Sequence, residues 1–189
     1  MINSTLTAKL DSQRLAAFDP KVQKAILRFY LRREYVSLDL IFDEIKDWSV
    51  IEQLFYLEFV YQQQGSYIDQ AVVCQPQYVV DTGIRKLRVD FRFSLPDPVM
   101  PVLPPILFYV ELDSFRWHDR TPKEFAKGKR RMRVLQRKGQ AAYGFAASEV
   151  LSNAVACVFE VVSAMETDLI ERRRLARLVT FTASSHSRV

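Results

Sequence analysis

The most constraining feature of this sequence is an apolar run, Ile106 to Val110, that leads directly into the acidic residues Glu111 and Asp113. Such a run is typical of a strand that is buried on both faces. Buried carboxylates need a specific partner, because an unpaired charge in an apolar environment costs several kcal/mol. Two residues apart on a strand, these side chains point to the same face, roughly 6–7 Å apart. A divalent cation bound to both is one solution, and ordinary salt bridges are the other.

The residues before this strand predict helices. Asp19 and Pro20 have the pattern of an N-cap followed by proline at the first helical position, and a second short helix is expected over residues 38–46. A third is expected over residues 49–63, where Ser49 and Glu52 have the spacing of a capping box. We expect residues 1–46 to form a helical extension that packs against the core or mediates homodimer formation.

Two strand patterns follow these helices. Residues 71–80 contain Pro76, which restricts them to an edge strand or a bent strand. Residues 84–93 alternate strictly, so that Asp90 lies on a polar face with Arg88 and Arg92. The next segment, residues 94–105, holds five of the eight prolines and predicts a rigid, irregular connector.

Helices and one further strand complete the pattern. Residues 121–138 predict a helix with Thr121 as N-cap and Gly139 as its stop, and a short strand is expected over residues 141–146. A helix starting at Ser148 and a separate Arg-rich helix over residues 167–178 follow, with a frayed end over residues 180–189. This order predicts an α/β fold in which a small mixed β-sheet is flanked by helices.

Positive charge is concentrated in one segment, although the net charge of the chain is only +5. The predicted helix after Thr121 and its flanks carry many basic residues against the single acid Glu124. Such a cluster is either a solvated helix face or a surface for a polyanion. The candidates for contact with nucleic acid are Arg120, Lys123, Lys127, Arg130 and Arg131.

Cysteine content and hydropathy bear on the cellular setting. Cys74 and Cys157 lie far apart in apolar surroundings, so both are predicted to be buried free thiols. The first residues contain no apolar signal segment, and no stretch approaches the roughly 18 apolar residues that span a membrane. We therefore expect a cytoplasmic protein that makes no contact with membranes.

Several short motifs, taken in order over residues 49–164, resemble the PD-(D/E)XK nuclease superfamily. The resemblance is narrower to the branch related to very-short-patch-repair endonucleases and small endonuclease-like proteins. The sequence departs from that pattern at Asp113, where the wider superfamily has lysine, at Ser114, and over residues 144–147. The matching residues are Glu52, Val89-Asp90-Phe91, Val110-Glu111-Leu112-Asp113, His118-Asp119-Arg120-Thr121, Arg131, Leu135, Gly139 and Ser148-Glu149.

The resemblance implies a restriction-endonuclease-like core over residues 47–165, followed by a basic C-terminal helix and tail over residues 166–189. It also implies a metal-dependent endonuclease or nickase that uses Mg²⁺ or Mn²⁺ to hydrolyse phosphodiester bonds, most naturally in DNA. Asp90, Glu111 and Asp113 would then be the metal ligands and catalytic acids. His118 and Glu52 would be the remaining catalytic residues. Carboxylate oxygens are the ligands that Mg²⁺ prefers in proteins.

Structural interpretations remain open beside this one. Glu52 has the spacing of a simple capping glutamate, Asp90 could pair with Arg88 or Arg92, and His118 could be an ordinary loop residue. The departures over residues 144–147 motivate a second hypothesis, a catalytically inactive nuclease fold that binds nucleic acid or a protein partner. A third is an interaction module in which the N-terminal helices bind a partner protein.

Overall fold

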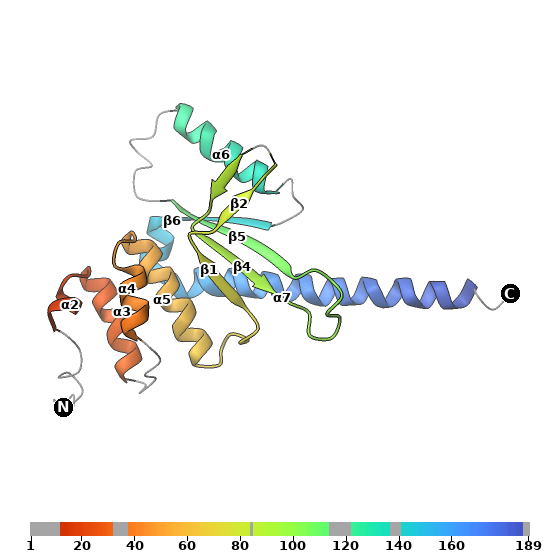
Figure 1. Ribbon diagram of the computed structural model, residues 1–189, viewed down its shortest axis with the longest axis horizontal. Coiled ribbons are helices and arrows are strands. Elements are labelled where there is room, and N and C mark those ends of the chain that lie inside the picture. The colour runs from red at the N-terminus through yellow and green to blue at the C-terminus, as the bar shows by residue number, and fades with distance from the viewer. Residues whose placement is uncertain (1–11, 32–37, 84, 114–121, 137–140, 187–189) are drawn as a thin grey trace. The chain divides into compact units, whose positions relative to one another are not determined.

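The computed structural model describes residues 12–31, 38–83, 85–113, 122–136 and 141–186 (Figure 1). The chain divides into two compact units. The helical unit comprises Met1–Asp69 and Ala146–Val158, and the sheet unit comprises Gln70–Phe145 and Phe159–Val189. The predicted fold class, a small mixed β-sheet flanked by helices with helices at the N-terminal side, is confirmed.

The helical unit contains the predicted N-terminal helices. They are α2 (Ser12–Ala16), α3 (Pro20–Leu31), α4 (Leu38–Ile45) and α5 (Val50–Gln64). Helix α5 begins with a complete capping box, because the Ser49 side chain accepts the backbone N–H of Glu52 and the Glu52 carboxylate accepts that of Ser49. This arrangement satisfies two amide groups that a helix start leaves without partners.

A buried ion pair joins α3 to α5 inside the helical unit. Glu58 is only 4% exposed, and its carboxylate accepts hydrogen bonds from Arg28 and Gln62. The Arg28 guanidinium also lies 4.1 Å from the centre of the Tyr61 ring. Because all these groups contact one another, the charge of Glu58 is compensated in a region that water hardly reaches.

The sheet unit contains all six strands. They are β1 (Val73–Pro76), β2 (Val79–Asp81), β3 (Lys86–Arg88), β4 (Phe91–Leu95), β5 (Ile106–Asp113) and β6 (Ala141–Ala146). Four strands form one sheet in the order β1-β4-β5-β6, and β2 and β3 form a separate hairpin. Strand β4 is antiparallel to both of its neighbours. Helix α6 (Pro122–Gln136) connects β5 to β6, and these two strands run in the same direction (Figure 1).

Two predicted strands are each broken into two in the structure. Residues 71–80 form β1 and β2, separated after Pro76 by Gln77, whose φ is +50°. Residues 84–93 form β3 and β4, separated at Val89 and Asp90. The break allows β2 and β3 to pair as a hairpin while β1 and β4 continue in the main sheet. Alternation of side chains continues across the break, which is why the sequence pattern does not reveal it.

The four-stranded sheet has two different faces. Phe91 and Phe93 of β4 and Val110 of β5 are buried on one face. On the other face, Tyr109 packs with Leu135 of α6 and with residues of the β2–β3 hairpin. Because side chains alternate along a strand, Arg92, Glu111 and Asp113 project from this second face too.

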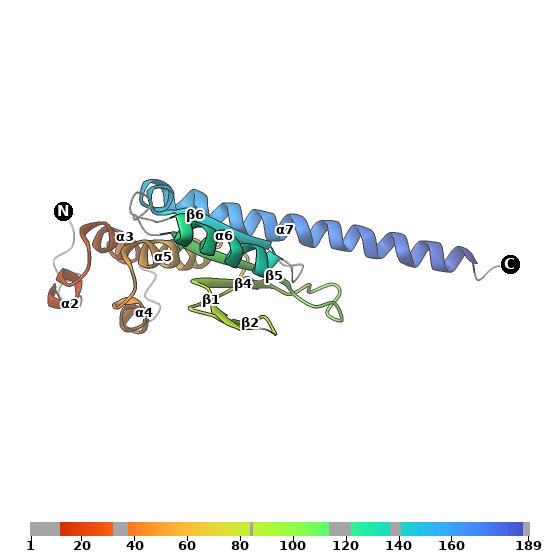
Figure 2. The same ribbon diagram turned by 90° about the horizontal axis from the view of Figure 1, so that it is seen from above.

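Helix α7 (Ala147–His186) consists of a short and a long helical segment that meet at a kink at Asn153, and the long segment continues through the residues where the sequence predicted a break and a frayed end (Figures 1 and 2). The prediction was wrong because residues 163–186 contain no glycine or proline to end a helix. The single irregularity in α7 is Asn153, with φ −156° and ψ 73°. Its side chain accepts the backbone N–H of Ala156, as an N-cap does for the longer segment that follows.

Two further predictions are corrected. Cys157 is buried and Cys74 only half-buried, although both are free thiols as expected. One stretch, Ala147–Arg177 of α7, is long and apolar enough to cross a membrane by length and composition alone. The sequence analysis missed this stretch because two glutamates, Glu149 and Glu160, interrupt its apolar runs. A core helix of a globular protein meets the same criteria.

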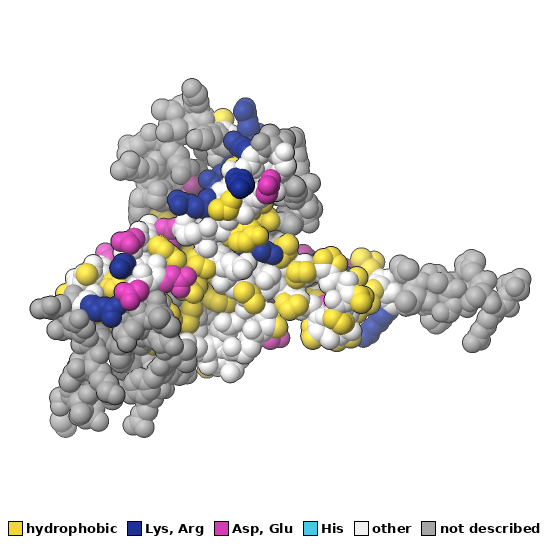
Figure 3. Space-filling model, in the orientation of Figure 1, with side chains coloured by type: hydrophobic (Ala, Val, Ile, Leu, Met, Phe, Trp, Pro, Cys, Tyr) yellow, Lys and Arg dark blue, Asp and Glu magenta, His cyan; other side chains and the backbone are white. Residues whose placement is uncertain are grey.

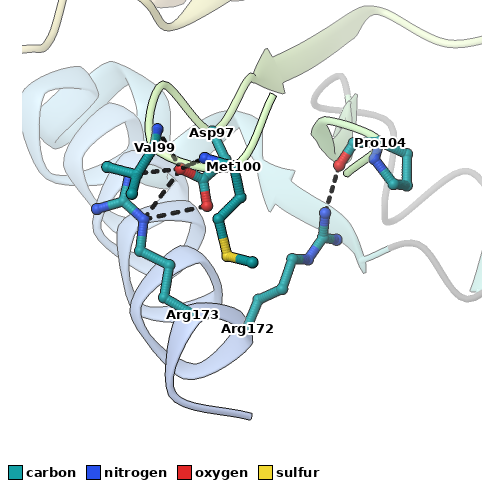
Figure 4. A network of polar contacts seen from close by, with 6 residues as sticks. All are labelled: Asp97, Val99, Met100, Pro104, Arg172 and Arg173. Carbon is teal, nitrogen blue, oxygen red and sulfur yellow. Dashed lines mark hydrogen bonds and ion pairs between the residues drawn. The ribbon is translucent and has the colours of Figure 1, made fainter. Parts of the chain in front are cut away.

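Two arginines of α7 form polar contacts with the proline-rich connector after β4 (Figure 4). Asp97 is 2% exposed, and its carboxylate accepts N–H groups of Val99 and Met100 and a two-pronged contact from Arg173. The Arg173 hydrogen bond is the main reason that the pKa of Asp97 falls to about 2. The neighbouring Arg172 donates to the carbonyl oxygen of Pro104. The connector is therefore held in place by contacts with residues that are far from it in the sequence.

Candidate functional site

Asp90 and Glu111, two of the predicted catalytic acids, lie near each other. Asp90 immediately precedes β4, whose first residue, Phe91, is paired with Val110 of β5. The Asp90 carboxylate accepts the N–H of Leu112, the residue after Glu111, and its charge raises the pKa of Glu111. Asp113 follows on the same face of β5, at its last position. The three acids are thus grouped at one end of the strand pair.

Asp90 is held in place by backbone groups on both sides. Its carboxylate accepts the N–H of Leu112 at 2.6 Å, and its own carbonyl oxygen accepts the N–H of Gln77 at 2.7 Å. Arg92 makes its polar contacts elsewhere and forms no ion pair with Asp90. The position of the Asp90 carboxylate is therefore fixed chiefly by the sheet and not by an arginine two residues away.

Glu111 is the most perturbed acid of the group. Its side chain is 18% exposed, and one carboxylate oxygen lies 2.7 Å from a guanidinium nitrogen of Arg131 on α6. Burial, and then the negative charge of Asp90, raise the pKa of Glu111 to about 7, against the opposing effect of Arg131. Asp113 adds a smaller contribution in the same direction. Burial and the neighbouring acids thus disfavour the charged form of Glu111, and a cation bound beside it would favour that form.

The donor set suits a hard divalent cation. Asp90, Glu111 and Asp113 offer only carboxylate oxygens, which Mg²⁺ and Mn²⁺ prefer. Among the residues that the structure describes, no three Asp, Glu, His or Cys side chains are already arranged around a common point for a metal ion. Arg131 contacts Glu111 instead. Metal binding at this site would therefore require Glu111 to lose its proton and Arg131 to release it.

Basic side chains gather beside this group. Figure 3 shows Lys and Arg side chains in the part of the sheet unit where Figure 1 places α6 and the β2–β3 hairpin. The hairpin contribution did not stand out in the sequence, because its three basic residues are spread through an alternating pattern. The exposed members are Arg85, Lys86 and Arg88 of the hairpin and Lys129, Arg130 and Arg133 of α6.

The remaining predicted residues are placed as follows. Glu52 belongs to the helical unit, where it completes the capping box of α5. His118 and Arg120 lie outside the described residues. Lys123 and Lys127 lie on α6, with side chains that are also outside the described set. The group that the structure does bring together consists of Asp90, Glu111, Asp113 and Arg131.

Arg92 is the residue that the sequence analysis undervalued. Its guanidinium carbon lies 4.4 Å from the centre of the Tyr78 ring, and one nitrogen donates to Gln75 at 3.1 Å. The alternating pattern placed Arg92 on the polar face but suggested Asp90 as its partner. The bend at Gln77 brings β1 and the start of β2 beside β4, which is a tertiary feature that local pattern cannot show.

Comparison of the chain with protein-family models, curated proteins and solved structures gave no match. The resemblance to PD-(D/E)XK nucleases therefore stays a prediction. The arguments about activity that follow depend on the geometry and chemistry of the site itself.

Proposed function

We propose that this protein is a metal-dependent endonuclease or nickase of the PD-(D/E)XK type, which hydrolyses phosphodiester bonds in DNA. The observation that supports the proposal most strongly is the proximity of Asp90, Glu111 and Asp113, with the pKa of Glu111 raised to about 7 by burial and by the charge of Asp90. A group of acids that raises the pKa of one of its members, next to exposed basic side chains, suits a cation and a polyanion together.

Each residue of the site would have a distinct role in catalysis or binding. Asp90 and Glu111 would hold Mg²⁺ or Mn²⁺, with Asp113 as a further oxygen donor at the end of β5. The bound ion would supply a Lewis acid that stabilises negative charge on the scissile phosphate and activates a water. Asp90 needs no reorganisation for this role, because the Leu112 N–H already orients its carboxylate. The exposed basic residues of α6 and the hairpin would bind the phosphate backbone without reading its sequence.

Arg131 would have two positions in this account. Without nucleic acid it forms the ion pair with Glu111 at 2.7 Å. A guanidinium group binds phosphate in two-pronged fashion as readily as it binds carboxylate. Binding of the DNA backbone would therefore draw Arg131 toward phosphate and leave Glu111 free for the metal ion.

A plasmid-nicking assay tests the proposal. Supercoiled DNA is incubated with the protein and Mg²⁺ or Mn²⁺, and the same assay is run with Asp90→Asn, Glu111→Gln and the control Glu44→Gln, whose side chain is exposed in α4. We expect relaxed or linear product with the wild type and the control, at least a hundredfold less with the two site variants, and none in EDTA. Intact DNA in every metal would refute the proposal.

One observation favours a second candidate function. Arg131 contacts Glu111, and no ready-made group of metal ligands exists among the described residues. An inactive nuclease fold that only binds nucleic acid would have this arrangement. It predicts binding that weakens with salt, proceeds in EDTA and is unchanged by Asp90→Asn.

A further inference from the structure

We propose that Arg92 forms a binding site for a phosphate group, beside the acids and on the same face of the sheet. This inference rests on the proposed function and adds to it, because it names the residue that would hold the substrate backbone next to the reacting centre. Arg92 is singled out by its contacts, by the absence of an ion pair to it among the described residues and by its place in the strand register.

Among the described residues, the direct contacts of the Arg92 guanidinium are with neutral groups. One nitrogen donates to the amide oxygen of Gln75, and the group lies over the Tyr78 ring. Within the described part of the chain, no carboxylate lies at ion-pair distance from Arg92, whereas Arg28, Arg131 and Arg173 each have one. The acids of the site are farther away, so a bound anion would be a negative group in direct contact with this half-buried charge.

A second observation concerns hydrogen bonding. The Nε–H of Arg92 is buried and has no acceptor among the described residues. Buried donors without acceptors are rare in folded proteins, because each one loses its hydrogen bond to water without a replacement. Arginine presents five N–H donors in a planar fork that matches phosphate oxygens. The contact with Gln75 uses one of them, at an exposed edge of the group that a ligand can reach.

The position of Arg92 fits a phosphate next to the acids. Arg92 is the second residue of β4, and Asp90 immediately precedes that strand. Its partner across the strands is Tyr109, so Glu111 is its diagonal neighbour. A phosphate held by Arg92 would therefore lie close to the acids without displacing the groups that hold Asp90.

The side chain is also held ready for such a ligand. Stacking on Tyr78 and the hydrogen bond from Arg92 to Gln75 restrict its rotamers before any ligand binds. Binding to an ordered side chain avoids the loss of side-chain entropy that a mobile arginine would undergo. A purely structural arginine would gain nothing from an added anion, and this difference can be measured.

The first test uses inorganic pyrophosphate in EDTA, so that neither metal nor cleavage is involved. The melting temperature is measured for the wild type, for Arg92→Gln and for the control Lys24→Gln, which removes an exposed positive charge from α3. We expect pyrophosphate to raise the melting temperature of the wild type and of the control, and to leave Arg92→Gln unchanged. Equal rises in all three proteins would overturn the inference.

The second test measures binding of duplex DNA in EDTA at several salt concentrations. Arg92→Gln is expected to weaken binding several-fold and to lower the slope of log K against log salt by about 0.9, the value for one lost phosphate contact. If Arg92→Gln does not fold, Arg92→Lys replaces it, with an intermediate loss expected because the charge stays and the fork is removed. Binding and slope equal to those of the wild type would contradict the inference.

The nicking assay distinguishes a failure of the phosphate-site inference from a failure of the proposed nuclease activity. If the wild type cleaves DNA and Arg92→Gln cleaves equally well with an unchanged KM, the inference fails while the proposed function stands. If pyrophosphate binding is lost in Arg92→Gln but the wild type cleaves in no metal, the phosphate site stands and the proposed nuclease activity fails.

Discussion

The raised pKa of Glu111 makes the stability of the metal-free protein depend on pH in a defined direction. The carboxyl group takes up its proton more readily in the folded chain than in the unfolded chain, because its pKa rises from an ordinary value of 4.5 to about 7. This contribution to stability is complete below about pH 4.5 and is lost as the pH rises through 7. A rise of the pKa from 4.5 to about 7 corresponds to a change of about 3 kcal/mol in the free energy of unfolding.

Glu111→Gln tests this reasoning, because glutamine has the shape of the protonated acid and cannot ionise. Urea unfolding in EDTA, followed by circular dichroism, gives the free energy of unfolding at pH 5 and pH 8. Between these values we expect the wild type to lose about 2–3 kcal/mol more than Glu111→Gln, and Glu44→Gln to behave like the wild type. The same pH dependence in the wild type and in Glu111→Gln would refute the argument that burial and Asp90 disfavour the charged form.

Two further predictions concern the ion pairs that hold each unit. Arg28→Ala leaves Glu58 buried without its partner and should lower the free energy of unfolding in urea by about 3–5 kcal/mol. Arg14→Ala removes an exposed pair and should lower it by at most about 1 kcal/mol. Similar losses of stability for both variants would contradict this prediction. Asp97 should stabilise the fold above about pH 4 and lose this effect as the pH falls through 2, because Arg173 lowers its pKa. Arg173→Ala should therefore lower the melting temperature at pH 6 much more than at pH 2, and an equal drop at both values would count against the pair.

Local signals predicted part of the fold well. The apolar run that ends at Glu111 is β5, and the start of α6 at Pro122 follows the proline rule. The capping box of Ser49 and Glu52 is formed as its spacing indicated. Each of these features depends on residues within a few positions of one another, so the sequence contains the whole signal.

Features that depend on distant contacts could not be read in this way. The β2–β3 hairpin branches off because Gln77 bends the chain, and alternation passes through the bend unchanged. The pairing of Glu111 with Arg131 depends on how α6 lies over the sheet, which no short-range pattern specifies. The stacking of Arg92 on Tyr78 likewise depends on contacts between segments that no short-range pattern specifies. The acids of the site were thus predictable, while the arginines that surround them were assigned by the tertiary structure.

Titration of the protein with Mn²⁺, followed by electron paramagnetic resonance at pH 8, tests the central claim most directly. At this pH the carboxyl group of Glu111 is largely ionised, since its pKa is about 7. We predict one bound ion per chain in the wild type, at least tenfold weaker binding in Asp90→Asn, and tighter binding in Arg131→Ala, which frees Glu111 from its ion pair. Equally weak binding in all three proteins would contradict the claim that Asp90, Glu111 and Asp113 form a cation site.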